Sequence, residues 1–498
     1  MRYYSTRGKS EYATASETII KGLAPDGGLY VPAEKITPFA PDNLPGGTYI
    51  DLATTIFKPF LTDYDDDEIK TMVQASYSQK AFDHPEVTPV IRLSDQLHVL
   101  ELWHGPTSAF KDIALQLLPR LLTSALKKSG DQTEVVILTA TSGDTGKSAL
   151  AGFRDVPGIR IFVYYPQNGV SEVQMLQMTT QEGRNVEVTA VEGNFDDAQT
   201  GVKQIFNDHR LAVDLAKAGY QLSSANSINW GRLLPQIVYY FFAYSDLVNK
   251  GAIEAGEEIN FVVPTGNFGN ILAGYYARLL GLPVHRLICA ANSNNVLSEF
   301  ISSGIYMSRR PLHLTLSPSM DILISSNLER LLFEISGHDA ELICSLMQNL
   351  ADRGEYSIGQ ETCTILQQLF WSDFTNDAET LKAIATTYTD YNYLLDTHTA
   401  VGKVVLDKYL ARTNDSHHSV LLSTANPFKF AGSVIQALFG HSRYERTSEL
   451  ELINILARET GKPIPHNLMD LDQKPVIHKQ VIARNNMRDH LLSKLHLV

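Results

Sequence analysis

Cysteine is scarce in this chain. Only three cysteines occur among 498 residues, at Cys289, Cys344 and Cys363, and no two have the spacing of a Cys-x-x-Cys zinc motif. Three cysteines are too few for a disulfide framework, which favours a reducing compartment. We therefore expect a cytoplasmic protein and predict no metal site.

Long apolar runs and an excess of positive charge are also missing. The most apolar stretch, residues 237–244, is far shorter than the roughly 20 apolar residues that span a bilayer. The first seven residues lack the apolar centre of a secretory signal. Lys and Arg total 42 against 55 Asp and Glu, a formal charge of −13, whereas nucleic-acid binding usually needs a basic surface. The sequence thus predicts no membrane segment and no nucleic-acid partner.

Repeats and low-complexity linkers are absent as well, so domains must be located from changes in pattern. Length favours about three domains of roughly 150 residues each. The turn-rich residues 1–92 form a candidate N-terminal domain, after which short β-branched runs alternate with helical patterns, as in βαβ units around a parallel sheet. The expected strands are 134–140, 159–165, 185–191, 260–263, 287–291 and 419–423, and the expected helices are 111–118, 170–178, 197–215, 232–248 and 270–280.

A lysine opens one of the expected helices. In His104-Gly-Pro-Thr-Ser-Ala-Phe-Lys-Asp112, Lys111 lies in the first turn, where the helix dipole and the apolar Phe110 would lower its pKa. A deprotonated amine is the form that a lysine nucleophile needs. The alternative is a surface lysine whose stem packs over Phe110.

Two glycine-rich loops follow expected strands, where ligands bind in open α/β sheets. Residues 141–148, Thr-Ser-Gly-Asp-Thr-Gly-Lys-Ser, differ from a nucleotide-binding P-loop by Thr141 in place of glycine, and no acidic residue ends a neighbouring strand to hold magnesium. Residues 264–270, Pro-Thr-Gly-Asn-Phe-Gly-Asn, would let successive amides face one phosphate at the start of a helix. Each loop alone is equally consistent with a tight turn, and an ATP-binding module is the further alternative for the first.

Together these segments resemble the threonine synthases, which are fold-type II pyridoxal-phosphate enzymes. The resemblance implies an α/β fold with two open parallel lobes, the cofactor pyridoxal 5′-phosphate between them, and an N-terminal domain. The matching stretches occur in the same order along nearly the whole chain, at residues 1–8, 24–32, 104–112, 140–146, 226–232, 235–240, 264–270 and 423–427. The domains expected from it are 1–92, a larger cofactor-binding lobe of 93–129 and 226–498, and a smaller substrate-closing lobe of 130–225.

The resemblance also implies roles for single residues in cofactor binding. Lys111 is similar to the catalytic lysine that forms a Schiff base with the cofactor. Thr424 is similar to the residue that hydrogen-bonds the pyridine nitrogen, and Asp144 would lie near the ring hydroxyl. The loop expected to bind the cofactor phosphate consists of Gly266, Asn267, Phe268, Gly269 and Asn270.

The reaction implied by the resemblance converts O-phospho-L-homoserine and water to L-threonine and phosphate. Lys111 would move protons at Cα and Cβ, so that the γ-phosphate leaves and water adds at Cβ. The expected contacts to the substrate carboxylate are Ser142, Gly143 and Thr145. The candidates for holding the substrate phosphate are the cations Lys147 and Arg232 and the donors Asn229 and Ser108.

Several of these assignments have alternatives. Lys147 could be exposed to solvent, Arg232 could pair with a carboxylate, and His398 could be a core histidine with satisfied hydrogen bonds. Ser108 and Asn426 replace an apolar residue and a histidine that are common in the family. The nearest alternative function is a threonine-synthase-like phospho-lyase that releases a 2-oxo acid. In either case the substrate is a small molecule, and we expect a monomer or a homodimer.

Overall fold

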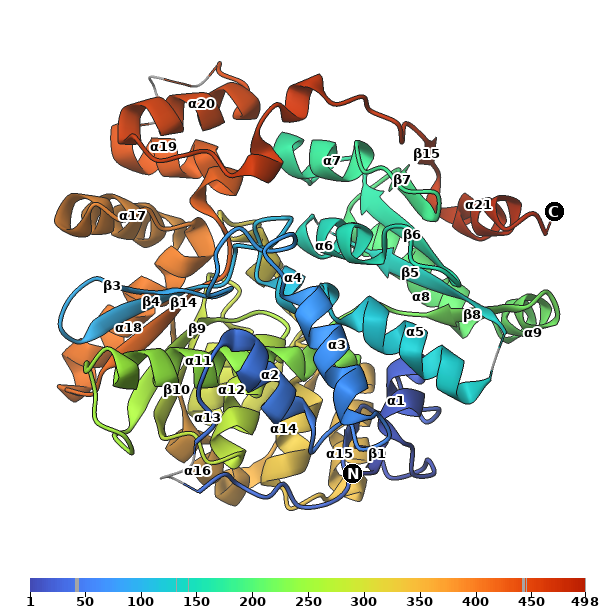
Figure 1. Ribbon diagram of the computed structural model, residues 1–498, viewed down its shortest axis with the longest axis horizontal. Coiled ribbons are helices and arrows are strands. Elements are labelled where there is room, and N and C mark those ends of the chain that lie inside the picture. The colour runs from blue at the N-terminus through green and yellow to red at the C-terminus, as the bar shows by residue number, and fades with distance from the viewer. Residues whose placement is uncertain (41–43, 131, 142, 441–443, 445, 498) are drawn as a thin grey trace.

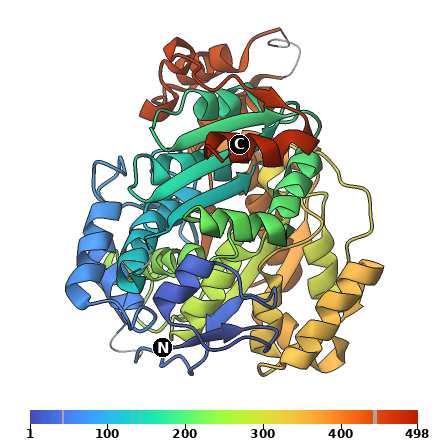
Figure 2. The same cartoon turned by 90° about the vertical axis from the view of Figure 1, so that its right-hand side faces the viewer.

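The computed structural model describes residues 1–40, 44–130, 132–141, 143–440, 444 and 446–497. Two sheets lie at the centres of two lobes, and the C-terminal segment crosses from one lobe to the other (Figure 1). In the view of Figure 2, the strands of the smaller lobe lie between C-terminal helices above and the N-terminal elements below. No described helix combines the length and the apolarity needed to cross a membrane.

The larger lobe is built on a six-stranded sheet. Its order is β13-β10-β9-β14-β4-β3, and all neighbours are parallel except the antiparallel pair β3 and β4. The strands are β3 (Val90–Arg92), β4 (Leu97–Glu101), β9 (Ile259–Pro264), β10 (Val284–Ala291), β13 (Phe370–Phe374) and β14 (Ser419–Ser423). The helices of this lobe are α4 (Lys111–Leu115), α5 (Leu118–Ser129), α10 (Trp230–Leu233), α11 (Pro235–Asn249), α12 (Gly269–Leu279) and α13 to α18.

Both faces of this sheet are buried, which explains its continuous apolar strands. Phe261 and Val263 of β9 join the main core with α11 and α12, whereas Val262 points to the opposite face. There it packs with Val401 and Val405 of α18 (Thr397–Thr413). The remaining elements of the lobe are α13 (Val296–Ser303), α14 (Leu328–Ile335), α15 (Ala340–Arg353), α16 (Gly359–Leu369), α17 (Asp377–Tyr391) and the antiparallel pair β11 (Ile305–Met307) and β12 (Glu355–Ser357).

The smaller lobe contains a five-stranded parallel sheet with the order β15-β7-β6-β5-β8. Its strands are β5 (Glu134–Ala140), β6 (Ile159–Pro166), β7 (Val186–Val191), β8 (Tyr220–Ser223) and β15 (Val481–Ile482). Its helices are α6 (Asp144–Phe153), α7 (Glu172–Thr179), α8 (Phe195–Asn207), α9 (His209–Lys217) and α21 (Met487–Lys494). Residues 477–497 thus lie against this lobe, whereas the sequence analysis had assigned all of 226–498 to the larger one.

The C-terminal segment between the lobes is reached through α19 (Ala431–Phe439) and α20 (Glu449–Thr460), followed by short 3-10 turns. Backbone amides of Ile477 and His478 donate to the carbonyl of Thr179 at the end of α7, at 3.0 and 3.1 Å. The pairing of β15 with β7 then continues this attachment. The segment therefore connects the two lobes directly.

The N-terminal domain does not form a core of its own. Its elements are β1 (Tyr3–Ser5), α1 (Ala15–Lys21), β2 (Tyr30–Pro32), α2 (Tyr49–Phe57) and α3 (Asp66–Ser76). Tyr3 packs on Trp230 of α10 with ring centroids 5.4 Å apart, and both rings belong to the main core. This domain is therefore packed onto the larger lobe.

The strand predictions agree closely with the structure, whereas three predicted helices are interrupted. Strands β5 and β14 have the predicted bounds. The predicted helix 197–215 is two helices, because Asp208 ends α8 and its side chain caps α9 by accepting from Leu211 N at 3.0 Å. The predicted helix 232–248 begins as α10 and restarts at Pro235. The predicted helix 111–118 stops at Leu115, and the next helix starts at Leu118.

One glycine is required where α6 packs on α4. A Cβ at Gly152 would overlap the carbonyl oxygen of Leu115, a backbone atom that cannot swing away. We expect Gly152→Ala to lower the free energy of unfolding by about 1–3 kcal/mol. The control is Gly432→Ala in α19, where the nearest atom, Leu452 Cδ1, is 3.6 Å from the added Cβ, so the change should be neutral or stabilise by up to about 1 kcal/mol. Equal urea-unfolding midpoints for the two variants would contradict the packing argument.

Candidate active site

The motifs found in the sequence meet where the central strands of the larger sheet end. Loop 265–268 follows β9, Thr424 follows β14, and Lys111 is held beside Thr424 because Phe110 N donates to Thr424 O at 2.9 Å. An isolated bridge between Ala109 and Ala425 adds to this attachment. The start of α6 in the smaller lobe faces the same point, since Asp144 Oδ2 lies 3.6 Å from Lys111 Nζ. The carboxyl edge of an open α/β sheet is where ligands bind in such folds.

Lys111 is the central basic group of this site. Its side chain is only 12% exposed, and Nζ donates to Ser319 Oγ at 3.4 Å. Burial lowers the pKa of Lys111, and the positive charges of Lys429 and Arg232 lower it further, while Asp144 opposes the shift. The net direction is downward, so a larger fraction of the amine is neutral than in a surface lysine.

Asp144 is a buried carboxylate held between two lysines. Its Oδ1 lies 2.6 Å from Nζ of Lys429, whose side chain is fully buried, and accepts from Gln174 Nε2 at 3.1 Å. Burial alone would raise the pKa of Asp144, but the charges of Lys429 and Lys111 lower it well below its usual range. Asp144 is therefore ionised in the site.

Ser319 is positioned by a buried histidine. Its backbone N–H donates to Nε2 of His398 at 3.2 Å, so this nitrogen carries the lone pair. Nδ1–H of His398 then donates to Asp396 Oδ1 at 2.9 Å. His398 is thus a core histidine with both ring nitrogens bonded, one of the two readings that the sequence left open. It still contributes to the site because it supports the serine that contacts Lys111.

Loop 266–270 presents a row of free amide donors. Among the described residues, none of the N–H groups of 266–268 donates to a protein acceptor, and Gly269 and Asn270 open α12, where the first amides have no intrahelical partner. Phe268 adopts a left-handed conformation with φ of 63°, and its ring is buried against Phe370. A Cβ at Gly266 would lie 2.9 Å from Ser319 O, so a side chain would crowd the loop. This arrangement suits a phosphate group.

Asn270 adds an unused side-chain donor to this loop. Its Oδ1 accepts from the hydroxyls of Tyr239 at 2.6 Å and Tyr240 at 3.0 Å. These two bonds fix the amide so that Nδ2 is the donor left over, and Nδ2 is buried without a partner among the described residues. Buried donors are nearly always satisfied in native proteins, so this atom points to a ligand.

The predicted carboxylate-binding loop at the start of α6 is only partly described. Ser142 lies outside the described residues. Gly143 has φ of 142°, and a Cβ there would overlap the side chain of Gln174, so only glycine fits. Thr141 Oγ1 accepts from Gly143 N at 3.0 Å and from Gly146 N at 2.9 Å, which holds the loop. Thr145 lies half-buried in the first turn of α6.

Arg232 is a buried guanidinium without a carboxylate. It is 3% exposed, and among the described residues it forms no ion pair, although Nη1 donates to Ala225 O. Its Nε is buried without a hydrogen-bond partner in the described part of the chain. Burial lowers the pKa of Arg232 to about 10. The carboxyl of Asp112 opposes this shift in pKa without forming an ion pair with the guanidinium, so a bound anion would supply the direct counter-charge that Arg232 lacks.

The other three predicted substrate contacts are engaged in the fold. Asn229 caps α10 by accepting from Gly231 N at 2.9 Å and donates to Ile19 O at 3.0 Å. Ser108, at φ of 57°, donates to Asn467 Oδ1 at 3.0 Å. Lys147 is neither exposed nor in an ion pair among the described residues, and donates to Gln181 Oε1 at 2.6 Å. The structure therefore leaves Arg232 as the predicted cation beside Lys111.

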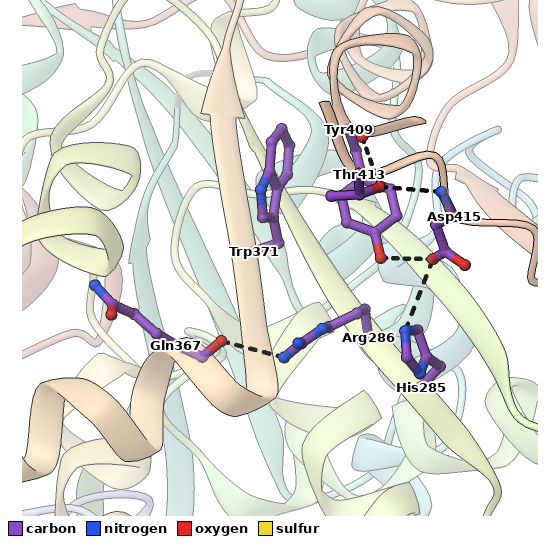
Figure 3. A pocket seen from close by; sticks show the side chains of 7 residues that line it. All are labelled: His285, Arg286, Gln367, Trp371, Tyr409, Thr413 and Asp415. Carbon is purple, nitrogen blue, oxygen red and sulfur yellow. Dashed lines mark hydrogen bonds and ion pairs between the residues drawn. The ribbon is translucent and has the colours of Figure 1, made fainter. Parts of the chain in front are cut away.

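A separate pocket of about 290 Å³ lies at the opposite, amino edge of the larger sheet (Figure 3). In it Asp415 accepts from Tyr409 and lies 3.8 Å from His285 Nε2. Nearby, Glu258, His285 and His417 are close enough together to hold a metal ion. His417 Nδ1 is bonded to Asp415 and its ring stacks on His285, so these groups have protein partners. None of the motifs identified in the sequence maps to this pocket.

Sequence reasoning missed Lys429 and Ser319. Lys429 follows β14 in Asn-Pro-Phe-Lys-Phe, and a lysine between two phenylalanines after a central strand is a signal that could have identified it. Ser319 lies in Ser-Pro-Ser-Met, which carries no comparable signal. Lys429 also donates to Thr107 O at 3.0 Å, so it ties the lysine-bearing segment to Asp144.

Comparison with known protein families covers most of the chain. Residues 2–77 match the model for the threonine synthase N terminus, 81–387 that for pyridoxal-phosphate dependent enzymes, and 399–488 that for the threonine synthase C-terminal region. A solved structure, that of pyridoxal-phosphate-bound threonine synthase from Brucella melitensis, superposes with a TM-score of 0.87 at 37% identity, over 99% of this chain and 98% of that one. Fold and site thus define a pyridoxal-phosphate-dependent enzyme of fold type II.

Two similar proteins identify the family within this class of enzymes. Threonine synthase of Pseudomonas aeruginosa is 43% identical over 89% of this chain and 91% of its own length. Human threonine synthase-like 1 is 38% identical over 96% of this chain, and the match spans 63% of that protein's length. The chain belongs to the threonine synthase family, and its cofactor is pyridoxal 5′-phosphate.

The residues present fit this cofactor. The free amides of 266–268 and the unpartnered Asn270 Nδ2 match its phosphate. Lys111, with its lowered pKa, matches its aldehyde, which reacts only with a neutral amine. Thr424, directly after β14, lies at the same edge of the sheet and would contact the aromatic ring.

Proposed function

We propose that this chain converts O-phospho-L-homoserine and water to L-threonine and inorganic phosphate. The observation that carries the proposal is the convergence of Lys111 with two anion-binding elements, the amide loop 266–270 and the unpaired, buried Arg232. One element suits the cofactor phosphate and the other suits a second phosphate. A substrate that itself carries a phosphate accounts for both.

In this proposal the cofactor is held at four points. Lys111 would hold it covalently through its amine, and residues 266–270 would bind its phosphate. Thr424 would donate to its pyridine nitrogen, and the ionised Asp144 would accept from its ring hydroxyl. When bound, pyridoxal phosphate withdraws electrons from the substrate carbon skeleton and so makes the Cα and Cβ protons acidic.

Lys111 moves the protons. Because burial and neighbouring cations lower its pKa, its free amine would accept a proton from Cα and, after releasing that proton, accept a second one from Cβ. The contact with Ser319 directs Nζ, and the bond from Ser319 N–H to His398 fixes that serine. After the phosphate has left, the hydroxyl of water adds at Cβ. The two carbon protons and the other proton of water go to Cγ, which becomes the methyl group, to Cα and to the departing phosphate, so the reaction balances.

The substrate is oriented by its two anionic ends. The backbone amide of Thr145 at the start of α6, with the predicted Ser142, would bind the carboxylate. The amide of Gly143 is bonded to Thr141 Oγ1, so Gly143 would contribute by shaping the loop. The ion pair between Asp144 and Lys429, at 2.6 Å, would offset the negative charge of Asp144 and so reduce its repulsion of the carboxylate. Arg232 binds the phosphate and stabilises the charge that develops as it leaves.

We also propose that the enzyme works in the cytoplasm as a monomer or homodimer without nucleic acid. The support is the negative net charge and the three cysteines, all of which are free thiols.

The test of the reaction supplies O-phospho-L-homoserine to the cofactor-loaded enzyme and measures three products. We expect threonine and phosphate in equal amounts. Phosphate with 2-oxobutyrate in place of threonine would select the phospho-lyase, and absence of phosphate release would reject both functions.

A further inference from the structure

A second pocket, of about 270 Å³, lies where the C-terminal segment covers the smaller lobe. Lys147 and Arg154 reach it from α6 and the residue after it, Gln177 from α7, and Lys474 from the C-terminal segment. Neither Lys111, nor Arg232, nor any residue of loop 266–270 lines it. It is therefore distinct from the proposed substrate site.

The charge of this pocket is positive and largely uncompensated. Three cations line it, Lys147, Arg154 and Lys474, against one acid, Glu182. Glu182 pairs with Arg154 at 3.3 Å and is mostly exposed to solvent. Among the described residues neither lysine forms an ion pair. Burial and the charge of Lys474 lower the pKa of Lys147 to about 7, although the carboxyl of Asp112 opposes the shift, so burial and the neighbouring cations outweigh the one nearby acid.

The floor of the pocket holds an unsatisfied amide. Gln177 is 1% exposed, and neither its Nε2 nor its Oε1 has a hydrogen-bond partner in the described part of the chain. A buried amide without hydrogen-bond partners destabilises the folded protein. A ligand with both acceptor and donor atoms, such as a partly protonated oxyanion, would satisfy both ends.

From these observations we propose that this pocket binds a phosphate group, as an anion site separate from that of the substrate. Lys147 and Gln177 form its base, and Lys474 and Arg154 form its rim. None of the described residues that line it is aromatic, which disfavours a nucleobase, and its volume admits a phosphate with waters or a small phosphomonoester. The proposal assigns Lys147 to this site rather than to the substrate phosphate.

A phosphate bound in this pocket would strengthen the connection between the two lobes. Lys147 lies one turn after Asp144 on α6, and Lys474 belongs to the segment that descends from the larger lobe. An anion between these two lysines replaces their repulsion by two attractions. It would therefore stabilise the attachment of the C-terminal segment to α6 and α7.

The test measures the binding of inorganic phosphate to the cofactor-loaded enzyme by calorimetry, without turnover. Lys474→Met should weaken binding by at least about tenfold, as for loss of one charge-assisted bond, and Lys474→Arg should restore it. Lys479→Met, which removes a lysine of the same segment outside the pocket, should leave the affinity unchanged. Equal affinities for Lys474→Met and Lys479→Met would overturn the proposal, whether or not the enzyme makes threonine.

A second variant tests the role of Gln177 at the base of the pocket. Gln177→Leu should raise the melting temperature without phosphate, because it removes a buried unsatisfied amide, and should abolish the rise that phosphate causes in the parent protein. A phosphate-dependent rise that persists in this variant would contradict the site. A parallel titration with glycerol phosphate identifies the source of the ligand: tighter binding of the ester indicates a phosphorylated metabolite, and tighter binding of the free ion indicates phosphate itself.

Discussion

Replacing Lys111 with alanine should lower the rate of threonine formation by at least about 10⁴-fold, because one amine both holds the cofactor and moves the protons. No neighbour can substitute. Lys429 is committed to Asp144 at 2.6 Å and to Thr107 O, and Arg232 remains protonated at neutral pH, with a pKa of about 10. The measurement is the steady-state rate with O-phospho-L-homoserine at saturating cofactor.

The Lys111→Ala variant also distinguishes covalent attachment of the cofactor from its non-covalent binding. Borohydride treatment should add the mass of the cofactor to the parent chain and not to Lys111→Ala, as measured on the intact protein. Loop 266–270 remains in the variant, so non-covalent cofactor binding should be weakened rather than lost. Lys80→Ala, at an exposed position, is the matched control for rate and mass. Retained activity, or borohydride labelling at another lysine, would mean that Lys111 is not the cofactor lysine.

Replacing Lys429 with methionine should lower the free energy of unfolding by about 3–5 kcal/mol, because it leaves the buried Asp144 without its closest counter-charge. The control is Lys58→Met, which breaks an ion pair of the same 2.6 Å length whose side chains are 45% and 70% exposed. That change should cost less than about 1 kcal/mol. Denaturant unfolding at neutral pH measures both losses.

The double variant Lys429→Met with Asp144→Asn tests whether the loss of stability comes from leaving a buried charge unpaired. It should lose less stability than the sum of the single variants, since neither charge is then left alone. Removing Lys429 also removes a charge that lowers the pKa of Lys111, so that pKa should rise. The free amine then appears only at higher pH, and the acid limb of the rate profile should move upward. Additive stability losses with an unmoved profile would show that Lys429 only fills space.

The architecture was predictable because buried parallel strands have a simple pattern. β5 and β14 are apolar on both faces and so appear as continuous runs bounded by polar residues. The points at which helices are interrupted were harder to predict. A helical pattern continues through Asp208 and Pro235, and whether a chain bends there depends on what each half packs against. The path of the C-terminal segment was missed because β15 has only two residues.

The site was predictable where it is local in sequence. Lys111 and loop 266–270 each sit in a short motif whose chemistry can be read from neighbouring residues. Lys429 and Ser319 are different, since Ser319 meets Lys111 across 208 residues and Lys429 meets Thr107 across 322. Their roles arise only when the sheet brings strand ends together. Asn229 shows what a motif leaves out, because this polar residue also caps α10, a structural role that the sequence did not indicate.

The strand β15 has a consequence for how the protein comes to be folded. It pairs with β7, and His490, which follows it, bonds to Thr189 across 301 residues. During synthesis the smaller lobe therefore emerges with the outer edge of β7 unpaired, and it stays so until residues beyond 480 leave the ribosome. Exposed strand edges invite pairing with other chains, and such distant contacts form slowly. The vulnerable interval for aggregation is thus the translation of the part of the larger lobe that follows β8, with closure of that edge among the last steps of assembly.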